Sequence, residues 1–130
     1  MSSPTRYRSP LAGARGHGAA RSGAGHWIAQ RVTALALIPL TLWFVASVIA
    51  LIGADHASFS AWMANPLVAV PMVLFLLAGF YHAMLGVQVV IEDYIQSEGW
   101  KTALVIGMKF IFVFLGGLGV FSVLKIAFGG

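Results

Sequence analysis

The sequence predicts an all-α membrane protein with three transmembrane helices. Hydrophobic residues make up 59% of the 130 residues and charged residues 9%, whereas a soluble domain carries about 25% charged residues. Three long runs, residues 32–52, 66–91 and 102–128, are almost free of charge, and about 20 apolar residues suffice to cross the hydrocarbon core. Because backbone groups cannot remain unpaired in lipid, these runs are expected to be helices. A soluble bundle is disfavoured, since charged side chains are too few to cover a water-facing surface.

The N-terminal segment, residues 1–25, differs in composition from the rest of the chain. It is rich in Arg, Ser, Gly and Ala and has no acidic residue. A mitochondrial transit peptide shares this bias, but we favour a flexible basic tail that follows the positive-inside rule. The remaining residues, 26–130, form the expected membrane-anchor domain, with transmembrane helices at about 30–52, 66–92 and 102–127.

The basic residues orient the three spans. Arginines precede or open the first span: Arg6, Arg8, Arg15, Arg21 and Arg31. The loop 53–65 has no basic residue, and Lys101 and Lys109 flank the start of the third span. With the N-terminus inside, every Lys and Arg except Lys125 lies on the inner side, as the positive-inside rule requires. The net positive charge therefore marks orientation and not a nucleic-acid partner, since no soluble basic domain carries it.

The second span contains an ionisable side chain deep in an apolar run. His82 lies about 14 Å from the inner end of the run at 1.5 Å per residue, and ionisable groups at such depth face the bundle interior or a partner. Ala78 and Gly86 lie one turn to either side, on the same helix face. These small residues leave room for a flat macrocycle beside a nitrogen ligand. Close helix packing, with His82 as a hydrogen-bonding group, needs the same residues.

An acid and a phenol end the second span. Asp93 returns to nearly the same helix face as His82, about 16 Å nearer the inner surface, and Tyr94 is adjacent to it. Such a pair at the membrane boundary can bind and protonate a carbonyl-bearing ligand, although an interface anchor beside a helix-end acid has the same composition. The helix dipole disfavours an acid at this end, which favours a functional role.

The chain contains no cysteine, which excludes a thiolate iron–sulfur site and covalent haem attachment within it. This absence does not exclude a non-covalent haem held by histidine, which would take two axial ligands, and His82 is the one histidine inside a span. A methionine of this chain, a second subunit or a second copy of this chain would supply the other ligand. Three helices are also few to enclose a macrocycle, so we expect a partner in the membrane.

The pattern formed by His82, Ala83, Gly86, Asp93 and Tyr94 resembles the D-type hydrophobic membrane-anchor subunit of succinate dehydrogenase, respiratory complex II. The stretch RVTALALIPLTLWF, residues 31–44, resembles the first helix of that family. The longer stretch GHWIAQRVTALALIPLTLW is closest to its alphaproteobacterial branch. The resemblance implies that the three helices are half of a heterodimeric helix bundle, completed by a second, cytochrome b-type anchor subunit.

The same resemblance implies a haem site. His82 would be an axial ligand of the iron of haem b, and Gly86 would clear room for the macrocycle. Arg31 would face a haem propionate from the start of the first helix. His26 would be a neighbour of that propionate or of the quinone site.

The resemblance also implies a quinone site and a division of labour. Tyr94 would donate its hydroxyl to a ubiquinone carbonyl, with Asp93 supporting the site and delivering protons. No residue of this chain would act on succinate, because a flavoprotein subunit oxidises it and an iron–sulfur subunit passes the electrons on. The expected location is the bacterial inner membrane, with the N-terminus cytoplasmic, in preference to the mitochondrial inner membrane. The alternatives are an anchor of another quinone-linked cytochrome b complex, such as fumarate reductase, or a haem-free structural or transport subunit.

Overall fold

The structure, a computed structural model, describes residues 19–130, with side chains from Gly23 onward. Four helices form this part of the chain: α2 (Ala19–Ala50), α3 (His56–Met63), α4 (Pro66–Tyr94) and α5 (Glu98–Ala127). The three long helices are each long and apolar enough to cross a membrane, and residues 19–130 contain no strand. The prediction of an all-α fold with three membrane-spanning helices is therefore confirmed.

Two of the helices begin before the spans that hydropathy indicates. α2 starts at Ala19 and α5 at Glu98, ahead of the expected residues 30 and 102. Hydropathy marks the part of a helix that lipid covers, whereas intrahelical hydrogen bonds continue into the interface, where polar residues are tolerated. Residues 19–25, which were expected to belong to the tail, are helical, and the first part of that tail, residues 1–18, lies outside the described residues.

The short helix α3 lies in the segment that was expected to be a plain loop. Its N-cap is Asp55, whose Oδ1 accepts a 2.8 Å hydrogen bond from the backbone N–H of Ser58. Hydrogen bonds from the side chain and the backbone N–H of Ser58 also hold the pKa of Asp55 below its ordinary value, because they favour the charged carboxylate. Asn65 caps α4 in the same way, accepting from the Leu67 N–H at 3.0 Å. Both caps use the residue types that favour helix starts.

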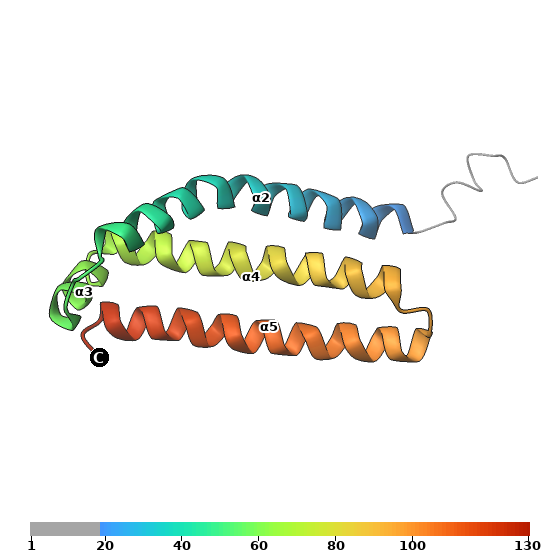
Figure 1. Cartoon of the computed structure of the whole chain (residues 1–130). Coiled ribbons are helices and arrows are strands. Elements are labelled where there is room, and N and C mark those ends of the chain that lie inside the picture. Colours follow the sequence, from blue (N-terminus) through green and yellow to red (C-terminus); the bar gives the residue numbers. More distant parts are fainter. Residues whose placement is uncertain (1–18) are drawn as a thin grey trace, which may run out of the picture.

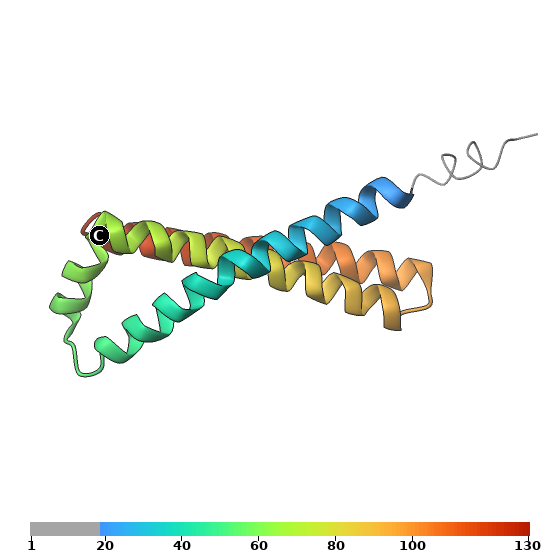
Figure 2. The ribbon, with the colours of Figure 1, turned by 90° about the horizontal axis from the view of Figure 1, so that it is seen from above.

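Helix α4 is the centre of the bundle, with α2 packed on one side and α5 on the other (Figure 1). α4 and α5 run almost side by side, whereas α2 crosses α4 obliquely (Figure 2). The N-terminal end of α2 and the C-terminal end of α4 therefore diverge at the end of the bundle opposite α3. α2 is also curved (Figure 1), and it contains Pro39, which has no N–H to donate to the helix.

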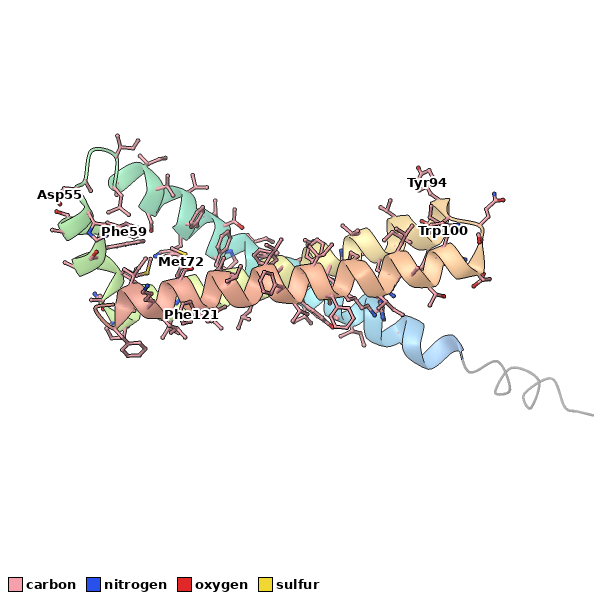
Figure 3. All side chains as sticks on the ribbon, turned by 90° about the horizontal axis from the view of Figure 1, so that it is seen from below. Asp55, Phe59, Met72, Tyr94, Trp100 and Phe121 are labelled. Carbon is pink, nitrogen blue, oxygen red and sulfur yellow. The ribbon has the colours of Figure 1, made fainter. Side chains whose placement is uncertain are left out.

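The packed core lies at the α3 end of the bundle. Its buried residues are Met63, Val68, Met72 and Val123. Aromatic pairs join the helices around it, and the rings of Phe44 on α2 and Phe75 on α4 stack with centroids 4.6 Å apart. Figure 3 shows Phe59 and Met72 in this part of the molecule and Tyr94 and Trp100 at the far end. The α3 end thus fixes the three long helices, and the other end is less tightly closed.

Glycines let α5 approach α4 closely. A Cβ added at Gly116 would lie 3.5 Å from the ring of Phe80, and one at Gly119 would lie 3.3 Å from Leu76. In lipid, helices associate through such close van der Waals packing because burying apolar side chains brings little gain over lipid contact. These glycines therefore serve helix packing.

The surface of α2 is largely uncovered within this chain. No described side chain of α2 is buried, and Leu35 and Leu42 are 67% and 68% exposed. A soluble monomer rarely exposes a continuous apolar surface of this kind. Lipid or another membrane chain must therefore cover the helix.

Candidate functional site

His82 lies at the interface between α4 and α2. Its Nδ1 is 3.0 Å from Oγ1 of Thr33 on α2. Within residues 19–130 this is the one side-chain hydrogen bond that joins two helices, since the others link residues of one helix or its cap. The ring is half-buried. It is therefore turned towards a neighbouring helix and not towards the acyl chains.

The depth of His82 makes this polar contact important. Because α4 continues to Tyr94, His82 lies about 18 Å from the C-terminal end of the helix at 1.5 Å per residue. An imidazole at such depth is costly unless it is paired. Thr33 provides the polar partner, and a threonine hydroxyl can do so at little cost because it also bonds to its own helix backbone.

A cavity of about 440 Å³ lies between the N-terminal half of α2 and the C-terminal half of α4. It is lined by Gly23, His26, Trp27, Gln30 and Arg31 from α2 and by Leu85, Gly86 and Val89 from α4. Small-molecule sites typically measure about 300 to 1,000 Å³. The cavity brings together three residues that the sequence suggested, His26, Arg31 and Gly86. Gly86 is one turn from His82 on the same face of α4.

Gly86 has no packing role that requires glycine in the described part of the chain. A Cβ at this position would lie 3.9 Å from Nε2 of Gln30, an ordinary van der Waals distance. The absence of a side chain therefore widens the cavity and does not relieve a clash between α2 and α4.

The cavity has a positive end without a matching anion. The acidic residues of the chain are Asp55, Glu92, Asp93 and Glu98. Among the described residues, Lys101 and Glu98 form the one ion pair, at 3.1 Å. Arg31 instead stacks on Trp27, with its guanidinium carbon 5.3 Å from the ring centroid, a cation–π contact. Residues 1–18 contain no acid, so an anion paired with Arg31 would most simply come from outside the chain.

Two glutamines carry buried acceptors without donors. The Oε1 atoms of Gln30 and Gln88 are buried and lack a hydrogen-bond partner within the described residues, although Nε2 of Gln88 donates to Glu92 at 2.9 Å. An unsatisfied buried acceptor costs about 1 to 3 kcal/mol. Water in the cavity would remove that cost for Gln30, which lines it, and a partner chain could do so for either residue. The sequence reasoning missed both glutamines and Thr33. Each is a polar side chain within or next to an apolar run, and this feature could have identified them.

Asp93 and Tyr94 lie apart from this cavity. They end α4, neither lines the cavity, and neither side chain hydrogen-bonds to another described residue. Tyr94 is 80% exposed and projects from the end of the bundle that also carries Trp100 (Figure 3). Residues 19–130 therefore do not enclose these two side chains, and another chain would have to complete a pocket around them.

The described residues fit a haem held from one side. No three His, Asp or Glu side chains cluster as a metal site within residues 19–130, but a haem iron takes only one protein ligand from each side. Nδ1 of His82 forms a hydrogen bond with Oγ1 of Thr33. Nε2 has no partner in this part of the chain and is not among its buried unpartnered atoms, so it reaches the protein surface. A free nitrogen, a small neighbouring residue and an unpaired arginine are what such a group requires.

Comparison with known proteins gives consistent matches. A family model described as succinate dehydrogenase/fumarate reductase transmembrane subunit matches residues 5–116. The succinate dehydrogenase hydrophobic membrane anchor subunit of Rickettsia bellii is 35% identical over 103 residues, which cover 79% of this chain and 82% of that protein. The subunit of the same name from Paracoccus denitrificans is 33% identical over 105 residues, covering 81% of each chain. That of Rickettsia conorii is 32% identical over 101 residues, 77% of this chain and 80% of the other. No solved structure matches significantly.

Proposed function

The chain belongs to the family of succinate dehydrogenase/fumarate reductase transmembrane subunits, and from this premise we propose that it anchors succinate dehydrogenase, holds haem b and forms part of the ubiquinone site. The observation that carries the proposal is the contact between His82 and Thr33. It holds a deep imidazole against α2, beside a cavity whose arginine lacks an anion.

On the haem side, each residue has a separate task. His82 offers Nε2 as an axial ligand, and Gly86 leaves the adjoining turn of α4 without a side chain. Arg31, supported by Trp27, would pair with the haem carboxylates, and His26 lines the same cavity. When bound, the haem supplies one-electron redox chemistry. A partner anchor subunit would supply the other ligand, because His82 is the one histidine inside the three apolar runs of this chain.

On the quinone side, the task is to deliver protons at the membrane boundary. Tyr94 donates a hydrogen bond to a quinone carbonyl, and the exposed carboxylate of Asp93 takes up protons from the aqueous side. Reduction of a quinone needs two electrons and two protons. A position at the end of α4, in contact with water, can supply the protons. The partner anchor and the iron–sulfur subunit would close the pocket around both side chains.

The orientation follows from charge. Arg31, Lys101 and Lys109 lie towards the end of the bundle where α4 ends and α5 begins, and the N-terminal tail adds further arginines. The positive-inside rule places this end on the cytoplasmic side of the bacterial inner membrane. The iron–sulfur subunit would dock there and connect the anchor to the flavoprotein.

A His82→Ala substitution in the purified complex tests the proposal. We expect loss of haem, measured as haem per complex in a reduced-minus-oxidised spectrum, while the subunits still co-purify. His56→Ala is the matched control, because His56 is exposed and lies on α3 at the opposite end. Normal haem content in the His82 variant would show that this residue is not a ligand.

A haem-free structural subunit is the competing function, because a packing histidine would also bond to Thr33. The two functions differ in the absorption spectrum of the wild-type complex. Absence of a b-type haem spectrum from an intact complex would favour the structural role. The chains that co-purify distinguish a succinate dehydrogenase anchor from an anchor of another quinone-linked complex.

A further inference from the structure

The contact between α2 and His82 determines which ring nitrogen is free. We infer that Thr33 is a positioning residue for the haem ligand: its oxygen accepts a hydrogen bond from Nδ1–H of His82, which leaves Nε2 unprotonated and directed away from α2. The inference rests on the proposed function, because it assigns a role to Thr33 in haem binding.

The number of hydrogens on Thr33 leads to this assignment. The hydroxyl has one hydrogen, and Oγ1 lies 2.7 Å from the carbonyl oxygen of Ala29 and 3.1 Å from that of Gln30. Both carbonyls are acceptors, so the hydroxyl donates back to its own helix, and the shorter distance selects Ala29. The lone pairs of Oγ1 then face Nδ1 at 3.0 Å. Of these two atoms Nδ1 must be the donor.

The opposite arrangement is less favourable. If Thr33 donated to Nδ1, the contact with the Ala29 carbonyl would be lost and the ring hydrogen would move to Nε2. No residue within 19–130 accepts a hydrogen bond from Nε2, so an N–H would remain unpaired at a membrane depth where water is scarce. The first arrangement makes two hydrogen bonds and the second makes one, which selects the tautomer with hydrogen on Nδ1.

This tautomer prepares the ring for iron. A metal-bound histidine coordinates through an unprotonated nitrogen and usually donates its other N–H to an acceptor, which fixes the ring and raises its basicity. The two nitrogens lie on different edges of the imidazole. Holding Nδ1 against α2 therefore turns Nε2 towards the surface of the chain, where it is free of protein partners. Without the hydroxyl of Thr33, no hydrogen bond from α2 would fix the tautomer or the orientation of the ring.

The test uses the whole purified complex and three substitutions. Thr33→Val removes the hydroxyl and keeps the shape, whereas Thr33→Ser keeps the hydroxyl. Thr41→Val makes the same chemical change at an exposed position of α2 and serves as the control. The readouts are haem per complex, the haem midpoint potential and the spin-resonance spectrum of the oxidised haem.

We expect Thr33→Val to weaken haem binding about 10- to 100-fold, the usual effect of removing such a partner. Any haem that remains should have a more positive midpoint potential, because a less basic axial ligand stabilises the oxidised iron less. Thr33→Ser and Thr41→Val should match the wild type in all three readouts.

The outcomes separate this inference from the proposed function. If His82→Ala loses haem while Thr33→Val behaves like Thr41→Val, the role of Thr33 is wrong and the haem assignment stands. If His82→Ala retains haem, both are wrong. Should Thr33→Val fail to assemble, Thr33→Ala replaces it under the same criteria. Altered haem properties in an assembled Thr33→Ser complex would also overturn the inference, because that variant keeps the acceptor.

Discussion

Replacing Arg31 by glutamine should release haem from the complex without disturbing the helices. Arg31 is exposed at the cavity and has no carboxylate partner among the described residues. Its pairing with a haem carboxylate would therefore be the principal interaction that the substitution removes. Hydrogen bonds to charged groups contribute about 1.5 to 3 kcal/mol. At about 1.4 kcal/mol per factor of ten, haem affinity should fall roughly 10- to 150-fold.

Trp27 provides an internal comparison for this prediction. The Arg31 guanidinium lies over the Trp27 ring, with 5.3 Å between the guanidinium carbon and the ring centroid. An exposed cation–π contact contributes about 0.5 to 1 kcal/mol, so Trp27→Leu should weaken haem binding only about 2- to 5-fold. The two substitutions should therefore rank in a fixed order, with Arg31→Gln the more severe.

The assay is the rate of haem transfer from the complex to an excess of apomyoglobin. Lys101→Gln is the control, because Lys101 is a basic residue at the same end of the bundle but is already paired with Glu98 at 3.1 Å. Equal transfer rates for Arg31→Gln and Lys101→Gln would refute the reasoning. A larger effect of Trp27→Leu than of Arg31→Gln would refute the division of roles between the two residues.

Two further predictions concern the ends of the bundle. Tyr94→Phe should lower quinone reductase activity roughly 2- to 10-fold, the effect of one hydrogen bond, and leave succinate oxidation by an artificial acceptor unchanged; equal loss of both activities would contradict the quinone role. Met72→Ala should destabilise the α3 end by about 2 to 5 kcal/mol, since it empties a buried core position. Leu74→Ala, at a position that is 50% exposed within the chain, should change the thermal midpoint of the complex less, and similar losses for the two variants would show that Met72 is not in a close-packed core.

The uncovered surface of α2 would explain why this chain alone does not complete the proposed haem site. Of the other two long helices, α2 packs on α4 and not on α5, and Leu35 and Leu42 are exposed on it. A second membrane chain placed against this surface would cover both the apolar residues and the open side of the cavity that Gly86 lines, one turn from His82. The stability of the subunit and the completeness of its site are therefore expected to depend on the same interface.

Sequence reasoning singled out the principal residues of the proposed haem site but not the residues that contact them. His82, Gly86 and Arg31 were recognisable because a histidine in an apolar run, a glycine one turn away and an arginine at a span boundary are local features. Gln88 was also visible in the sequence, yet its buried and unpartnered Oε1 depends on what packs against α4. The helix α3 was missed for a related reason, because 8 residues are too few to show a helical period.

The sequence by itself determined the three spans, because hydropathy and the absence of charge are local properties that decide whether a segment can cross the hydrocarbon core. It also determined which side chains were unusual enough to need a reason, His82 above all. Only the tertiary structure decided that α2 packs on α4, that Thr33 meets His82 and that Arg31 shares a cavity with Gly86 while Tyr94 does not. The physical reason is that a membrane helix is apolar on every face. Its pairing is set by close packing and a few polar contacts, which become visible only when the helices are placed together.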